Sequence, residues 1–446
     1  MITDLRGLAL TGATSDAAQR FDQAVAAFNL YCGDPLGALD AALGLAPRFA
    51  IAALFKAQLL AIATEPAASQ AARDLLASVN GWPLDARERS HHEAARLILA
   101  GEWSAAALHL DRHHIEHPHD LMALQVGHLV DFFRGNARSL RDRVARTLPQ
   151  WPADMPGRGI VLGMLAFGLE EGGDYARAED AGRAALQAEP LDCWAHHAVA
   201  HVMEMQARHQ DGVGWARTRE AQWAGAGNFF QVHNWWHLAL CHLELGEAAS
   251  ALALYDGPIR GTRSAVAVDM VDASALLWRL QLGGHDVGDR WLELASAWDA
   301  HADGRSYAFN DWHAAMAWLG AGRDADVQRL ETTLRTAGHD SEAARWALET
   351  GADLVAGFAA FQHRRWDEAI ESLWRARPIA NRFGGSHAQR DIIDLTLTEA
   401  ALRGGRCDSA EALARERLAL RPHSGLNQTL LRRALAPAVP GAAASA

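Results

Sequence analysis

A short turn pattern recurs between helical segments of this chain, and it constrains the fold more than any other feature of the sequence. In each copy a turn residue, usually Gly, is followed about five positions later by a small residue. Alanine and leucine recur at helical spacing on both sides of the turns, which predicts pairs of helices. The copies are Gly33–Ala38, Gly101–Ala106, Gly173–Ala178, Gly246–Ala251, Arg365–Ala369 and Gly405–Ala410.

Small residues and prolines stand at fixed distances around these turns. A second small residue lies twelve positions before the first, and in several copies a proline lies twelve positions after it. Small side chains let paired helices approach closely and Pro ends the second helix, so this spacing is typical of the tetratricopeptide repeat. The residues concerned are Ala94, Ala166, Ala239 and Gly357 upstream, and Pro118, Pro190 and Pro422 downstream.

The chain contains about seven such helix pairs, with irregular spacing between residues 208 and 345. Alternating runs of β-branched residues, which would indicate strands, are missing. We therefore expect an all-α fold, with one tetratricopeptide-like helical-repeat domain over residues 1–436. No Pro/Ser-rich linker divides it, which predicts a continuous α-solenoid or a closed superhelix. Residues 437–446 are mostly small and are expected to form a disordered tail.

The repeat register predicts which side chains face the concave groove. In tetratricopeptide arrays the first helix of each pair faces this groove, mainly through positions 2, 5, 9 and 12. With Pro190 at position 32, the next repeat begins at Cys193. Its groove positions are Trp194, His197, His201 and Glu204, whose spacing of three, four and three places them on one helix face.

The helices that follow continue this polar surface. Their groove residues are His233 and Trp236 with His237 beside them, then Asp269, Asp272 and Arg279, then Trp312 with His313 beside it. Imidazoles, carboxylates and aromatic rings from roughly residues 190–320 are therefore expected to converge. Such a set is typical of general acid–base chemistry or of a pocket that binds a small polar molecule.

This convergence favours an enzyme that needs no organic cofactor, an acid–base hydrolase or lyase. His201 or His237 is the expected base, Glu204 orients the imidazole, and Asp272 belongs to the same catalytic group. Arg279 is expected to hold an anionic group of the substrate. The remaining substrate-binding residues are expected to be His197, His233, Trp194, Trp236, Asp269 and His313.

Three other interpretations remain open for these residues. A protein-interaction scaffold would use the same groove for a peptide or protein partner, and would leave its polar side chains exposed. A metalloprotein would use the i, i+4 pairs His197/His201 and His233/His237 to bind zinc or iron, although the sequence contains no HExxH motif and indicates no third ligand. The histidines could also be hydrogen-bonded interior residues, and Asp269 and Asp272 could be charges at a helix N-terminus.

A second group of histidines is expected to be structural. His109, His113, His114, His117 and His119 lie at the end of a second helix and in the loop that follows it. Histidine near a helix C-terminus interacts favourably with the helix dipole. We expect this group to lie at the surface.

Composition excludes several classes of function. The net charge of −12 argues against nucleic acid as a partner. No GxGxxG, Walker A or GxSxG motif occurs, and the single lysine, Lys56, argues against a Schiff-base or pyridoxal-phosphate enzyme. No apolar run is long enough to span a membrane, and the first residues do not resemble a signal peptide, so we expect a cytoplasmic protein. The four cysteines form no CxxC pair and are expected to be buried thiols. A solenoid without strongly polar ends is also compatible with a homodimer.

Three segments of the chain resemble one known family. The segments 196–206 (HHAVAHVMEMQ), 233–240 (HNWWHLAL) and 269–279 (DMVDASALLWR) are similar to the tetratricopeptide repeat protein 38 family. The resemblance spans most of the chain and is most specific within residues 190–320. It implies a helical-repeat fold and a cytosolic protein, but it implies no reaction.

Overall fold

The computed structural model describes residues 2–436 and folds them almost entirely into helices. The predicted tail, residues 437–446, lies outside the described residues. Within residues 2–436 there is no β-strand; two isolated bridges pair Thr3 with Ala9 and Cys32 with Asn228. The predicted all-α helical-repeat class is confirmed.

The first half of the chain forms α1 (Ser15–Leu30), α2 (Pro35–Leu45), α3 (Ala50–Ile62), α4 (Pro66–Ser78), α5 (Ala86–Leu99), α6 (Trp103–Glu116), α7 (Leu121–Phe133), α8 (Ala137–Thr147), α9 (Arg158–Glu171), α10 (Tyr175–Ala188), α11 (Cys193–Met205), α12 (His209–Thr218) and α13 (Glu220–Trp223). The second half forms α14 (Gln231–Glu244), α15 (Ala248–Leu254), α16 (Ala267–Leu282), α17 (Arg290–Ala297), α18 (Ala308–Gly320), α19 (Asp324–Arg335), α20 (Glu342–Trp346), α21 (Ala352–Gln362), α22 (Trp366–Ala376), α23 (His387–Arg403), α24 (Cys407–Leu420) and α25 (Gly425–Leu435). Short 3-10 or π segments are η1 (Leu148–Gln150), η2 (Tyr255–Ile259), η3 (Trp298–Ala300), η4 (Ala347–Gly351) and η5 (Arg377–Phe383). None of these helices has the length and apolar character needed to cross a membrane.

The six copies of the turn pattern lie where the sequence predicts, each between two paired helices. They separate α1 from α2, α5 from α6, α9 from α10, α14 from α15, α21 from α22 and α23 from α24. Ala94, Ala166 and Ala239 are fully buried. A Cβ atom on Gly357 of α21 would lie 2.6 Å from the Leu373 side chain of α22. Small residues are therefore required at these positions because the paired helices leave no room for larger ones.

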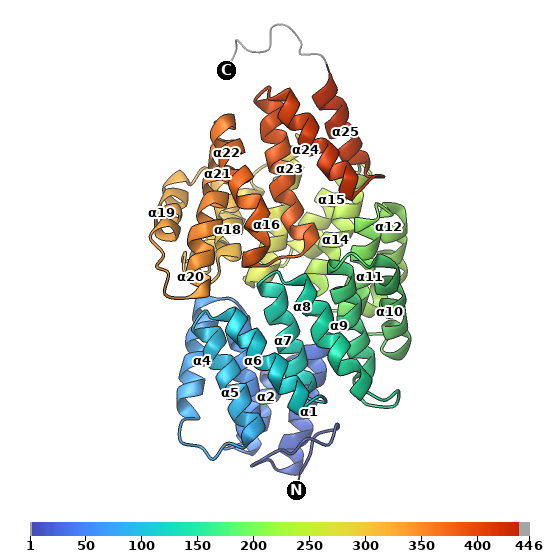
Figure 1. Cartoon of the computed structure of the whole chain (residues 1–446), viewed down its shortest axis with the longest axis vertical. Coiled ribbons are helices and arrows are strands. Elements are labelled where there is room, and N and C mark those ends of the chain that lie inside the picture. Colours follow the sequence, from blue (N-terminus) through green and yellow to red (C-terminus); the bar gives the residue numbers. More distant parts are fainter. Residues whose placement is uncertain (1, 437–446) are drawn as a thin grey trace.

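Later helices of the superhelix contact its N-terminal helices. Figure 1 shows α20 lying directly above the N-terminal helices, although more than 200 residues of chain separate α20 from α6. The Glu342 carboxylate of α20 accepts hydrogen bonds from the backbone N–H and the hydroxyl of Ser104, both at 2.6 Å. Nearby, the Asn310 side chain donates to the Thr64 carbonyl at 3.1 Å. The solenoid is therefore closed, one of the two forms that the sequence allows.

The inner face is covered by α23. The Arg279 guanidinium of α16 donates to the Ala388 carbonyl at 2.7 Å, and the Trp278 indole donates to the Thr396 hydroxyl at 3.0 Å. At the start of α23, the His387 N–H donates to the Glu171 carboxylate of α9 at 2.9 Å. The concave surface is consequently a contact between helices, and its side chains are removed from water.

The cysteines depart from expectation in one respect. All four are free, and Cys193 and Cys241 are buried as predicted. Cys32 and Cys407 are exposed, so the expectation that all four thiols are buried is wrong for these two. Both lie at or beside helix-connecting turns, where fewer neighbours cover a side chain.

Close contact between α8 and α9 predicts that Gly168→Ala destabilises the protein. A Cβ atom at this position would lie 2.6 Å from the Leu140 carbonyl carbon and from the Arg141 nitrogen, and backbone cannot move aside as a side chain can. We expect a loss of about 1–3 kcal/mol in the free energy of unfolding, measured by chemical denaturation.

Gly214→Ala is the matched control. Gly214 lies within α12, is exposed, and has open space at its Cβ position. This substitution is expected to raise stability by up to about 1 kcal/mol, because Ala has the higher helix propensity. Equal effects of the two substitutions would contradict the close packing of α8 on α9.

Candidate functional site

Two adjacent inner helices, α11 and α14, each contribute a pair of histidines. His197 and His201 lie four residues apart on α11, and His233 and His237 lie four residues apart on α14, so each pair shares one helix face. The start of α11 is held by Asp192, whose carboxylate accepts the Ala195 N–H at 3.0 Å. The two faces meet, and one ring nitrogen from each histidine lies within 4.8 Å of the others.

Three of these side chains point their Nε2 atoms at one another. The Nε2 atoms of His197, His233 and His237 are separated by 3.1, 3.1 and 3.2 Å. Ligand nitrogens around a tetrahedral ion with metal–nitrogen bonds near 2.05 Å would be about 3.3 Å apart. The triangle therefore has the dimensions of three ligands on one face of such an ion.

Two buried carboxylates hold the outer nitrogens of this triangle. His233 Nδ1 lies 3.0 and 2.9 Å from the two Asp272 carboxylate oxygens, and His237 Nδ1 lies 2.9 Å from Glu204 Oε2. A carboxylate accepts the hydrogen bond, so Nδ1 carries the proton and the inward Nε2 presents a lone pair. This arrangement of carboxylate behind histidine is the usual outer shell of a histidine metal site.

Burial favours the uncharged form of His197, His201 and His237. Desolvation, with the other histidines adding to it, holds the pKa of His197 and of His237 well below the ordinary value. Desolvation also lowers the pKa of His201 to about 4, against the opposing effect of Glu204. Neutral imidazole is the form that binds a metal ion.

Aromatic rings pack against the histidines and fix their orientation. The Trp236 ring is stacked on His233 with an interplanar angle of 15°, and Trp194 lies 5.0 Å from His197 between ring centroids. The Trp194 indole donates to His128 Nε2 at 3.2 Å, which anchors it away from the cluster. Both tryptophans are buried, so they support the imidazoles and do not form the walls of an open pocket.

Asp269 and Arg279 lie beside the cluster without joining it. Asp269 is in the first turn of α16, where a carboxylate suits the helix dipole, and burial raises its pKa to about 6. The Arg279 guanidinium lies over the Trp236 ring at 5.4 Å, and burial lowers its pKa to about 10. Within residues 2–436 no carboxylate lies within 4.0 Å of it, so Arg279 forms no ion pair with Asp269 or Asp272, and Asp272 is paired with His233 instead.

His313 of α18 is directed elsewhere. Its Nδ1 donates to the Phe309 carbonyl at 2.8 Å, and its ring packs on Phe309 and Trp312. His313 was expected in the site because it lies next to Trp312, a groove residue. In the structure it lies outside the four-histidine group.

Glu170 and Glu171, at the end of α9, are site residues that the sequence reasoning missed. The Glu170 carboxylate lies 3.4 Å from His201 Nδ1, and a ligand atom of Glu171 lies within 4.8 Å of both residues. Burial, with Glu171 as a neighbouring like charge, raises the pKa of Glu170 well above its ordinary value. The repeat register predicts a groove position for Glu170. With Ala166 at position 8, Glu170 is at position 12, which is the position that Glu204 holds in the next repeat.

The second histidine group is not at the surface, so that prediction is wrong for its central members. His113 and His114 are buried, and His113 meets His91 of α5 at Asp120. Asp120 Oδ2 lies 2.9 Å from His91 Nε2, 3.3 Å from His113 Nε2 and 3.1 Å from the Arg87 guanidinium. Arg87 already supplies a cation to this carboxylate, so the group is a hydrogen-bond network that joins α5 to α6.

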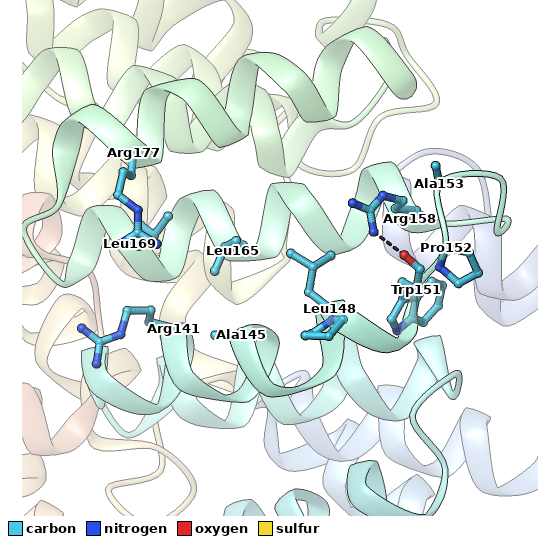
Figure 2. Close-up of a pocket in the computed structure, with 11 residues that line it drawn as sticks. Arg141, Ala145, Leu148, Trp151, Pro152, Ala153, Arg158, Leu165, Leu169 and Arg177 are labelled. Carbon is cyan, nitrogen blue, oxygen red and sulfur yellow. Dashed lines mark hydrogen bonds between the residues drawn. The ribbon is translucent and has the colours of Figure 1, made fainter.

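Open hollows lie away from these clusters. Figure 2 shows one of about 740 Å³ between α8 and α9, with Leu148, Leu165 and Leu169 along it and arginines at its ends. Its arginines are occupied: Arg158 donates to the Trp151 carbonyl and Arg177 to Asp174. None of the predicted site residues lines it. The converging lone pairs of the histidine cluster indicate chemistry more directly than an open hollow does.

Comparison with known proteins finds distant similarities only. No family model matches the chain. The Cut9–Hcn1 hetero-tetramer of APC/C is similar over 94% of this chain and 76% of that chain, at 14% identity and a TM-score of 0.45. Yeast Tom70 is similar over 94% of this chain and 88% of that chain, at 13% identity and a TM-score of 0.35. The resemblance to the tetratricopeptide repeat protein 38 family stays a prediction.

Burial of His313 predicts a specific loss of stability in acid. Its folded pKa is about 3, whereas that of histidine in an unfolded chain is about 6.5. Below pH 6.5 the unfolded chain takes up a proton that the folded protein does not, so stability falls as the pH falls. Between pH 7 and pH 5, His313→Gln should lose about 2 kcal/mol less unfolding free energy than the wild type.

Chemical denaturation at the two pH values measures this difference. The exposed His339→Gln is the control, and it should lose as much stability between pH 7 and pH 5 as the wild type does. If His313→Gln also behaved as the wild type, His313 would have to accept its proton in the folded protein.

Proposed function

We propose that this protein is a metal-dependent hydrolase of small polar molecules, with zinc or iron(II) bound by His197, His233 and His237. The observation that carries the proposal is the triangle of Nε2 atoms at 3.1–3.2 Å. The acid–base hydrolase or lyase expected from the sequence is thereby refined, because His237 becomes a ligand and a metal ion supplies the electrophile.

The lone pairs of the triangle favour a cation over a network of hydrogen bonds. His233 and His237 each donate through Nδ1 to a carboxylate, so their Nε2 atoms, 3.2 Å apart, are both acceptors. Two acceptors repel unless a proton or a cation lies between them. A proton on His197 Nε2 could be shared between them, whereas a metal ion would satisfy all three nitrogens together.

Charge balance supports a divalent ion. Asp272 and Glu204 place two carboxylates directly behind the triangle, and both are buried. A divalent cation bound to three neutral imidazoles would neutralise both carboxylates through the intervening rings. This compensation lowers the cost of burying two acids.

The ligand set favours a catalytic centre. Imidazole ligands suit zinc and iron, and catalytic zinc sites have three protein ligands with a fourth position for water. A bound metal lowers the pKa of that water into the neutral range. In such a centre Asp272 and Glu204 are positioning residues that fix the ring tautomers. His201 lies beside the triangle, in the same four-histidine group.

Access limits the substrate to small molecules. Most of the site is buried, but the His233 side chain retains 13% of its surface and Asp269 is partly exposed. Both residues lie in the first turn of their helices, α14 and α16. A substrate would approach from this side, where the carboxyl of Asp269 offers a polar contact.

The second candidate function is a protein-interaction scaffold, which the helical-repeat fold favours. A peptide in the concave groove would need exposed side chains there, and the stripe from Trp194 to Glu204 is buried. A partner protein would instead bind an outer surface such as the hollow between α8 and α9. This candidate predicts that removing metal leaves partner binding unchanged.

Metal content tests the proposed function directly. Wild-type protein equilibrated with zinc and then dialysed should retain the metal, and His197→Ala and His237→Ala should weaken zinc binding by roughly 100-fold or more. Elemental analysis and a zinc-competition titration measure this, with the exposed His339→Ala as control. Hydrolysis of a panel of small esters, amides and phosphate esters should occur with metal and stop on chelation. Wild-type protein without stoichiometric zinc or iron would overturn the proposal.

Asp272 and Glu204, the carboxylates behind the histidine ligands, should change the affinity for zinc but leave the three ligands in place. Asp272→Asn and Glu204→Gln keep the shape of each side chain but remove the charge that the imidazole Nδ1–H faces. We expect each to weaken zinc binding by about 10- to 100-fold while leaving saturation stoichiometry unchanged. Asp269→Asn, on the same helix as Asp272 but without a histidine partner, should have a smaller effect. Unchanged affinity in both variants would argue against a metal on the imidazoles.

A further inference from the structure

Glu170 is a buried carboxylate whose oxygens have no partner. The residue has 0% exposure, and neither oxygen accepts a hydrogen bond from any group in the described part of the chain. An ionised carboxylate in such a place strongly destabilises the folded protein unless a donor or a cation compensates it. In its ionised form this side chain therefore needs a partner that residues 2–436 do not supply.

His201 has the same deficiency on the adjacent helix. Both ring nitrogens are buried, and neither forms a hydrogen bond with the residues that the structure describes. His201 Nδ1 lies 3.4 Å from Glu170 Oε2. The two unpartnered groups thus face each other across the contact between α9 and α11.

Glu171 completes the group from the next position of α9. Its Oε1 accepts the His387 N–H at 2.9 Å, and its Oε2 lies 3.7 Å from the Arg390 guanidinium. Arg390 compensates Glu171 in part. It also acts to lower the pKa of Glu170, but burial outweighs this effect, and neither Glu170 oxygen has a hydrogen-bond partner in the described residues. One ligand atom from each of Glu170, Glu171 and His201 lies within 4.8 Å of the other two.

We propose that Glu170, Glu171 and His201 bind a second divalent cation beside the three-histidine centre. The proposal rests on the proposed function, because His201 belongs both to the four-histidine group and to this carboxylate group. A cation here would satisfy the orphaned atoms of Glu170 and His201 together. Two carboxylates and one imidazole suit zinc, iron(II) or manganese(II), and paired cations stabilise both the attacking and the leaving oxygen in hydrolysis.

The rival explanation is a protonated Glu170. Its hydroxyl would donate to His201 Nδ1, and no second ion would bind. The two explanations differ in the number of metal ions per chain and in the effect of removing the negative charge of Glu170.

Zinc stoichiometry of the full chain distinguishes them. Metal-free protein is equilibrated with Zn²⁺, dialysed and analysed for zinc. We expect about two zinc ions per wild-type chain, and about one for Glu170→Gln and for Glu171→Gln. The exposed Glu116→Gln is the control and should bind two. His237→Ala should lose zinc from the first centre.

Thermal unfolding provides the second measurement. Without metal, Glu170→Gln should unfold at the same temperature as the wild type or higher, because the substitution removes a buried charge that lacks a partner. With saturating zinc, the wild type should gain more in unfolding temperature than this variant does. A smaller or equal gain in the wild type would overturn the second site.

The outcomes separate the two proposals. One zinc ion in the wild type, retained by Glu170→Gln, overturns the second site and leaves the three-histidine centre in place. Two ions in both the wild type and Glu170→Gln also overturn it, because the second ion would then lie elsewhere. No stoichiometric zinc in the wild type overturns both proposals.

Discussion

Each ionisable group buried between the inner helices needs a partner, and this requirement organises the centre of the molecule. Asp272 and Glu204 are buried carboxylates, and each is matched by a histidine Nδ1 at 2.9–3.0 Å. Those pairings leave the Nε2 lone pairs pointing inward, where His197 meets them. The arrangement is therefore set by electrostatics as much as by packing, and it is complete only if something electropositive lies between the rings.

Closure of the superhelix creates this buried environment. In an open solenoid, the first helices of the repeats would present their polar residues to water. Here α23 covers the inner face, with Arg279 and Trp278 bonded to its backbone and side chains. The same residue types that would line a peptide groove are thus placed at low dielectric, where histidine is neutral and a carboxylate depends on its neighbours.

Much of the fold and part of the site could be predicted from the repeat register. Ala94, Ala166 and Ala239 mark helix contacts that are fully buried, and positions 5, 9 and 12 found His197, His201 and Glu204. Applied one repeat earlier, the same register identifies Glu170 as a groove residue at position 12. Applied two repeats before that one, it identifies His91 as a groove residue at position 5. His313 was assigned to the site by adjacency and Arg279 by the register, but contacts with their own helix and with α23 direct them away from the histidine triangle.

The amino-acid sequence alone predicts the helix pairs and the face of each helix on which the polar residues lie, because spacing along a helix sets direction about its axis. It could not determine which faces meet. That decision belongs to the tertiary structure, because His197 and His233 come within 3.1 Å only when α11 and α14 pack side by side. Burial was also decided there: α23 is distant in sequence from the helices that it covers, and its contact with them turned an expected groove into an enclosed cluster of imidazoles and carboxylates.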